Sequence, residues 1–125
     1  MKRIQEAILS IGGHQGRECY ELLCMAIYEA LKQQPVMPQM KEIWAAVKKK
    51  AYKEKATAVS KALERAVADL WEYGDREVLG TYQRSWGYDK PSPKEFIRVV
   101  AQRLWVSGAE VEERKGAELM SSSAH

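Results

Sequence analysis

Two basic residues, Lys61 and Arg65, stand four positions apart in a segment whose apolar residues recur with helical spacing. Residues at i and i+4 lie on the same side of a helix, so both side chains point in one direction. Lysine and arginine donate hydrogen bonds to O6 and N7 of guanine in the DNA major groove, and serine can bind several base edges. Ser60 and Glu64 flank this pair and also fall outside the apolar stripe. The pattern therefore predicts a base-reading set of Ser60, Lys61, Glu64 and Arg65.

A lysine cluster precedes these residues. Eight basic and three acidic residues lie between Lys41 and Arg65, whereas the whole chain has a net charge of only +3. A local basic patch on a nearly neutral protein is typical of a polyanion-binding surface. The candidate phosphate ligands, which would set affinity and register, are Lys48, Lys49, Lys50, Lys53, Lys55 and Thr57. A solvated lysine face is the alternative interpretation of the same pattern.

Helical periodicity predicts the two elements that carry these side chains. One helix is expected at about 39–52 and another at 57–73, with a short break between them and Thr57 as the N-cap of the second. This arrangement is typical of a helix-turn-helix, in which the first helix holds the second and the second enters the major groove. The apolar stripe that would face the core consists of Val59, Ala62, Leu63, Ala66, Val67 and Leu70.

The rest of the chain is also helical in pattern. Further helices are predicted at 4–11, 17–33, 75–79 and 94–106, bounded by glycines and prolines. Residues 80–93 are predicted to form a loop, and no strand pattern or internal repeat is found. We therefore expect an all-α fold, a compact bundle of five to six helices containing a helix-turn-helix. Residues 1–106 would form one domain, and residues 107–125 a charged, flexible C-terminal tail.

Several functional classes have little support in the sequence. No apolar run approaches the ~20 residues of a membrane span, and no signal peptide is present, which indicates a cytoplasmic protein without a membrane partner. Cys19 and Cys24 do not share a helix face, and with His14 they match no zinc spacing, so neither a metal nor another cofactor is expected. The chain has no glycine-rich phosphate loop and no Ser/His/Asp set, so we do not expect an enzyme.

Five segments occur in order and at spacings that match a known family. They read IQEAILSIGGHQG, CYELLCMAI, IWAAVKKKA, VSKALERAVADLWEYGD and KPSPKEFIRVVAQRL. From Ile4 to Leu104 the chain resembles the C-terminal DNA-binding effector domain of the stage-zero sporulation protein A family, response regulators of spore-forming bacteria. The resemblance implies a six-helix bundle that binds double-stranded DNA, often as tandem dimers on adjacent boxes, and regulates transcription. A homodimer on DNA is therefore a possible assembly.

The chain departs from this family at the reading face. The family's recognition helix usually reads Val-Glu-Arg-Ala-Ile-Arg, whereas residues 59–64 here read Val-Ser-Lys-Ala-Leu-Glu. In the family the domain follows a receiver domain, whereas this sequence starts directly with the effector domain, so it is either a fragment of a longer regulator or a free-standing protein. We expect a sequence-specific transcriptional regulator without its own receiver. The alternative is a protein-interaction module that kept the fold, lost specific DNA reading, and pairs with a related regulator or RNA polymerase.

Overall fold

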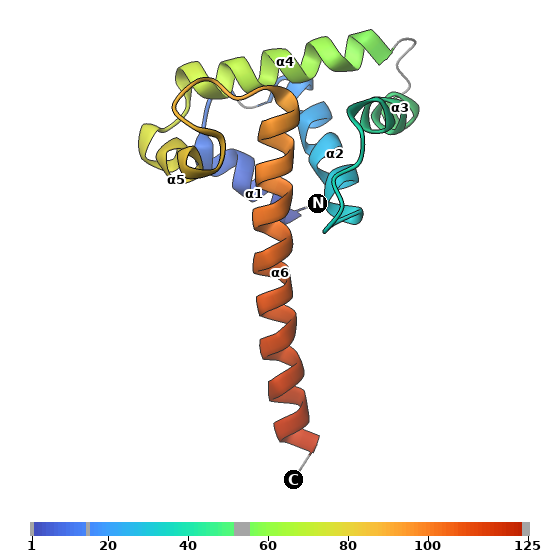
Figure 1. The fold of residues 1–125 in the computed structure, drawn as a ribbon, viewed down its shortest axis with the longest axis vertical. Helices are drawn as coiled ribbons and strands as arrows, with labels where there is room; N and C mark the ends of the chain where they lie inside the picture. Colours follow the sequence, from blue (N-terminus) through green and yellow to red (C-terminus); the bar gives the residue numbers. More distant parts are fainter. Residues whose placement is uncertain (1, 15, 52–55, 124–125) are drawn as a thin grey trace.

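The computed structural model describes the backbone of residues 2–14, 16–51 and 56–123, and the side chains of these residues up to Gly108 except Ala56. Six helices make up this part of the chain (Figure 1). They are α1 (Lys2–Ile11), α2 (Glu18–Lys32), α3 (Met40–Ala51), α4 (Ala56–Tyr73), α5 (Arg76–Trp86) and α6 (Pro93–Ser123). The described residues form no β-strand, so the predicted all-α class is confirmed.

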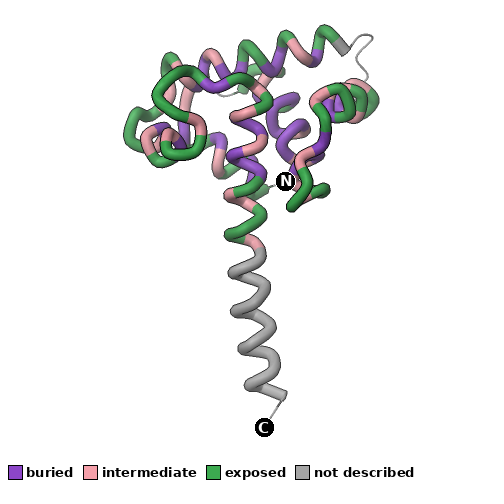
Figure 2. The backbone as a smooth tube through the Cα atoms, viewed as in Figure 1, coloured by how far each residue is buried: buried purple, intermediate pink, exposed green. Residues whose placement is uncertain are grey.

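Helix α2 lies at the centre of the bundle. It packs against α1, α3, α4 and α6, and Figure 2 shows buried residues along it and along the sides of α4 and α6 that face it. Small residues make this close packing possible: Ala26 and Ala30 are fully buried beside the larger Leu23 and Ile27. A helix that contacts neighbours on several sides buries more than one apolar stripe, which explains why most of α2 is buried.

Helices α3 and α4 contact each other and run in different directions. In Figure 1, α4 lies across the view, whereas α3 is seen nearly along its axis, so the two helices cross steeply. The connection between them falls in residues 52–55, outside the described part of the chain. Ile43 and Val47 of α3 are buried. All six residues of the predicted α4 stripe are buried too, which confirms that prediction.

Helix α5 is longer than the sequence predicted. The expected helix ended at residue 79, with a loop from Gly80, but α5 continues to Trp86. Asp75 caps its start by accepting hydrogen bonds from the amides of Glu77 and Val78. The rings of Tyr82 and Trp86 stack with centroids 5.5 Å apart. This aromatic packing stabilises the turns after Gly80, so the predicted loop was wrong for residues 80–86, while residues 87–92 do connect α5 to α6 without helical structure.

Helix α6 also continues past its predicted end. The periodic pattern indicated a helix at 94–106, and the helix in the structure runs from Pro93 to Ser123. Its first turns bury Phe96, Ile97, Val100 and Ala101 in the core. Arg3 of α1 donates a hydrogen bond to the carbonyl of Leu104 at 2.6 Å, which joins the two helices where α6 leaves the core.

Two turns far apart in the sequence bind each other. The amide of Asp75 donates to the carbonyl of Ile11 at 2.6 Å, and Gly12 and Gly74 form an isolated antiparallel bridge. A Cβ atom on Gly74 would collide with the carbonyl oxygen of Leu70 and with the Ile11 side chain, so this approach requires glycine. The contact fixes the end of α1, from which the chain leads into α2, relative to the end of α4.

Candidate nucleic-acid interface

The exposed face of α4 carries the predicted base-reading residues. Lys61, Glu64 and Arg65 are exposed, and Ser60 is half-buried at the edge of the face. The opposite face of α4 is buried in the core. This packing fixes the orientation of the helix, so the four side chains lie on its solvent-facing side. The prediction that Lys61 and Arg65 face away from the apolar stripe is confirmed.

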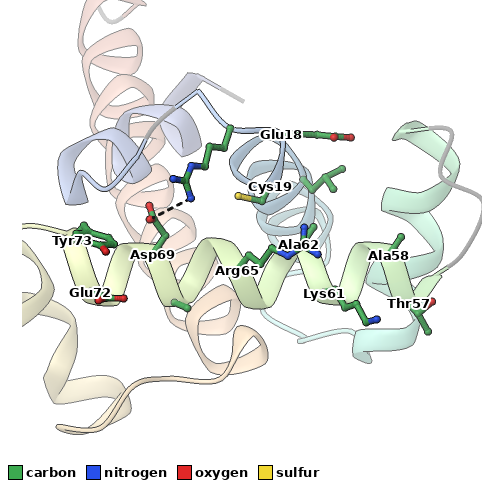
Figure 3. Close-up of a pocket in the computed structure, with 13 residues that line it drawn as sticks. Glu18, Cys19, Thr57, Ala58, Lys61, Ala62, Arg65, Asp69, Glu72 and Tyr73 are labelled. Carbon is green, nitrogen blue, oxygen red and sulfur yellow. Dashed lines mark ion pairs between the residues drawn. The ribbon is translucent and has the colours of Figure 1, made fainter.

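Lys61 and Arg65 line an open groove of about 1150 Å³ between the N-terminal end of α2 and the length of α4 (Figure 3). The residues that line it are Arg17, Glu18, Cys19, Leu22, Thr57, Ala58, Lys61, Ala62, Arg65, Ala68, Asp69, Glu72 and Tyr73. Ser60 and Glu64 are not part of this lining. The structure therefore separates the four predicted reading residues into a pair inside the groove and a pair beside it.

The charges in the groove are sorted along α4. Lys61 and Arg65 come first along the helix, and Asp69 and Glu72 follow one and two turns later. Phosphates repel carboxylates, so a polyanion has a favourable contact only with the part of the helix that ends at Arg65. Asp69 and Glu72 were not among the predicted site residues, although an aspartate next to the apolar positions Ala66 and Leu70 is a recognisable signal in the sequence.

Asp69 is the buried polar centre of the groove wall. Its side chain accepts hydrogen bonds from the amide of His14 at 2.8 Å, from Nδ1 of His14 at 2.7 Å, and from the hydroxyl of Tyr20. Arg17 Nη1 lies 3.7 Å from the same carboxylate, an ion pair drawn dashed in Figure 3. These contacts tie the α1–α2 turn and the start of α2 to α4.

The environment of Asp69 shifts two pKa values in opposite directions. Burial alone would raise the pKa of Asp69, but the hydrogen bonds from Tyr20 and His14 outweigh burial and lower this pKa to about 2. Burial and the neighbouring carboxylate raise the pKa of the Tyr20 hydroxyl. Asp69 is therefore an anion, and Tyr20 a neutral donor, over the whole physiological pH range.

Comparison with known proteins gives the family. A family model described as the sporulation initiation factor Spo0A C terminal matches residues 4–104. The chain belongs to the Spo0A C-terminal family. This is the DNA-binding effector domain of Spo0A, not a family of enzymes, so the chain is a DNA-binding regulatory domain of the sporulation type. No curated protein and no solved structure matches the chain significantly.

The predicted phosphate ligands of this Spo0A C-terminal domain are not equivalent. Lys49 is exposed and Lys48 half-buried near the end of α3. The ammonium group of Lys50 lies 2.6 Å from the Glu29 carboxylate of α2. Lys53 and Lys55 fall outside the described residues. Of the three predicted ligands on α3, Lys48 and Lys49 are therefore the two that can turn to a phosphate without breaking the ion pair to Glu29.

Thr57 lies in the first turn of α4 and not before it. The helix begins at Ala56, before the predicted N-cap, so Thr57 is not the N-cap. Its side chain is exposed and lines the groove close to Lys61. A hydroxyl in the first turn of a helix, together with the positive end of the helix dipole, suits contact with an anion.

The described residues offer little for metal chemistry. They contain no group of three or more His, Cys, Asp or Glu side chains that could hold a metal ion. Cys19 is half-buried in the groove wall, and Cys24 is buried, with its pKa raised to about 11 by burial. No helix among the described residues is long and apolar enough to span a membrane.

Proposed function

We propose that this Spo0A C-terminal domain is a sequence-specific double-stranded DNA-binding transcriptional regulator in which α3 and α4 form the helix-turn-helix. The observation that carries the proposal is the placement of Lys61 and Arg65 on the exposed face of α4, opposite the buried stripe. The steep crossing of α3 and α4 supports it, because a recognition helix must stand clear of the helix that holds it (Figure 1).

Each predicted residue except Lys50, which is paired with Glu29, has a role in this proposal. Lys61 and Arg65 donate to guanine edges from inside the groove, while Ser60 and Glu64 contact bases at its border, where a glutamate can accept from cytosine N4. Phosphates are held by Lys48, Lys49, Lys53, Lys55 and Thr57. Residues 1–106 act as the DNA-binding unit, in the cytoplasm and at the nucleoid, and two copies bind adjacent sites as a homodimer.

The test is a binding measurement on selected DNA. A labelled duplex is selected from a random pool, and its affinity is compared by fluorescence anisotropy with a scrambled duplex at several salt concentrations. We expect the selected duplex to bind at least about a thousandfold more tightly than the scramble, as for specific binders in general. Equal, steeply salt-dependent binding to both duplexes would mean that the protein contacts only the phosphates, through its lysines, and would contradict base reading.

A second function is favoured by the acidic half of the groove. Glu18, Asp69 and Glu72 match the three basic residues of the lining in number, so the groove is not strongly basic as a whole. A mixed surface of this kind suits a protein partner, such as a related regulator or RNA polymerase. Under this alternative, DNA binding is weak and sequence-blind, and the chain forms a stable complex with purified RNA polymerase or with a Spo0A-type regulator in size-exclusion chromatography.

A further inference from the structure

A buried carboxylate joins α2 to α3 near the C-terminal ends of both helices. Glu29 of α2 is 7% exposed. Its two oxygens lie 2.6 Å from the ammonium group of Lys50 and 3.1 Å from that of Lys32. Both ammonium groups also lie over the ring of Tyr28, at 4.6 Å for Lys50 and 5.1 Å for Lys32. We refer to Glu29, Lys32, Lys50 and Tyr28 as the Glu29 cluster.

The Glu29 cluster holds Lys50 more firmly than a surface pair would. A buried carboxylate without a cation is unfavourable because water no longer solvates it. Burial alone would raise the pKa of Glu29, but the adjacent ammonium groups of Lys50 and Lys32 outweigh burial, and this pKa is lowered. Lys32 sits three residues from Glu29 on the same helix, so within the cluster only Lys50 connects two helices.

Lys49 provides the contrast. It is adjacent to Lys50 in the sequence, and both lysines are exposed, but among the described residues Lys49 has no ion-pair partner. A phosphate contact made by Lys49 requires only that its side chain turn. The same contact made by Lys50 requires loss of a 2.6 Å ion pair and of a cation–π contact, and it leaves Glu29 with half of its partners.

We propose that Glu29 excludes Lys50 from the DNA-contacting set, and that Lys50 instead positions the C-terminal end of α3 against α2. Phosphate contact from this end of α3 then comes from Lys48 and Lys49. The inference rests on the proposed DNA-binding function. The three consecutive lysines then have two different roles. Lys48 and Lys49 bind phosphate, and Lys50 orients the helix that carries them.

The test compares Lys50→Gln with its matched neighbour Lys49→Gln in the full chain. Affinity for a labelled duplex of mixed sequence is measured against salt concentration. Lys49→Gln should reduce the slope of log affinity against log salt by about 0.9, the value for one lost phosphate contact. Lys50→Gln should leave this slope unchanged and weaken binding about threefold at every salt concentration, because α3 is displaced. A loss of affinity that is the same at every salt concentration is expected for a positioning residue. A loss of stability alone does not weaken binding as long as the variant stays folded.

Thermal unfolding supplies the second measurement. Lys50→Gln should lower Tm by about 5 °C, whereas Lys49→Gln should not change it. The effects of Glu29→Gln and Lys50→Gln should be non-additive in the double variant, because each removes the same contact. A salt slope that falls equally in both lysine variants would overturn the proposal. So would a Lys50→Gln variant with unchanged affinity, or additive Tm effects.

The two proposals fail in different ways. If the wild-type chain binds no duplex at all, the proposed DNA-binding function is wrong, and the unfolding measurements alone decide whether Glu29 and Lys50 join α2 to α3. If the wild type binds DNA and Lys50→Gln loses slope, the DNA-binding function stands and the exclusion of Lys50 is wrong.

Discussion

The imidazole Nδ1 of His14 lies 2.7 Å from Oδ1 of Asp69, although the two residues are 55 positions apart in the chain. The amide of His14 binds the other oxygen of the same carboxylate. Tyr20 of α2 adds its hydroxyl to that oxygen, so one buried side chain of α4 organises both the α1–α2 turn and the first turns of α2. The orientation of α4, and with it the direction in which Lys61 points, depends on a polar contact inside the bundle.

The first prediction concerns acid stability. Because the pKa of Asp69 is lowered from 3.8 to about 2, the folded state binds its proton less readily than the unfolded state. The resulting stabilisation, about 2 kcal/mol, is present above pH 4 and is lost as pH falls from about 4 to about 2. Urea unfolding of wild type and Asp69→Asn at a series of pH values should show a stability difference that shrinks over this window. A difference that stays constant down to pH 2 would argue against the assignment.

The second prediction concerns base reading. Lys61→Ala should lower affinity for a selected duplex by about tenfold and affinity for a scrambled duplex much less, because a base contact is lost in the first complex only. Lys2→Ala is the matched control, since Lys2 is an exposed lysine of α1, outside the groove lining. Anisotropy titrations on both duplexes provide the measurement. Equal losses on the two duplexes would reassign Lys61 to phosphate binding.

The third prediction concerns the buried side of α4. Leu63 is fully buried, so Leu63→Ala should reduce the free energy of unfolding by about 3 kcal/mol through lost apolar contact and a residual cavity. Leu9, with 59% of its surface exposed, is the control, and Leu9→Ala should change this free energy by less than about 0.5 kcal/mol. Denaturant unfolding monitored by circular dichroism measures both. Similar losses in the two variants would mean that α4 is not packed as described.

The fourth prediction uses two glycines of opposite character. Gly13 has φ +77°, and a Cβ atom there would collide with the Tyr20 hydroxyl and lie 3.0 Å from the Asp69 carboxylate. Gly13→Ala should therefore destabilise the fold by about 2 kcal/mol or more. Gly80 lies inside α5, where a Cβ atom would meet no other part of the protein within 4 Å, so Gly80→Ala should stabilise the fold by about 1 kcal/mol. We expect Tm to fall in Gly13→Ala and to rise in Gly80→Ala. A rise in both variants would contradict the claim that the turn at Gly13 requires glycine.

The elements with a strong local signal could be predicted from the sequence. The apolar spacing in α2 and α4 repeats over several turns, and the glycine and proline residues near their ends mark the boundaries to within a few residues. The face of α4 that carries Lys61 and Arg65 follows from the same spacing. The family resemblance from Ile4 to Leu104 is confirmed by the family model over the same residues.

The features that depend on contacts between distant residues could not be predicted. The turns of α5 after Gly80 are held by the stacking of Trp86 on Tyr82 and by its contact with Phe96 of α6, which local propensity does not reveal. Lys50 differs from Lys49 only because α2 places Glu29 beside it. In both cases one partner, Phe96 for Trp86 and Glu29 for Lys50, comes from another helix, whose position is set by tertiary packing.

The hydrogen bond from the Asp75 amide to the Ile11 carbonyl has a consequence for hydrogen exchange. The partner of this amide is in α1, and the Asp75 side chain caps α5 at the same time, so α1, α4 and α5 meet at one residue. This amide can exchange with solvent only when α1 separates from the α4–α5 turn. Its protection therefore reports cooperative opening of the bundle, although it belongs to a turn between two helices, where amides usually exchange early.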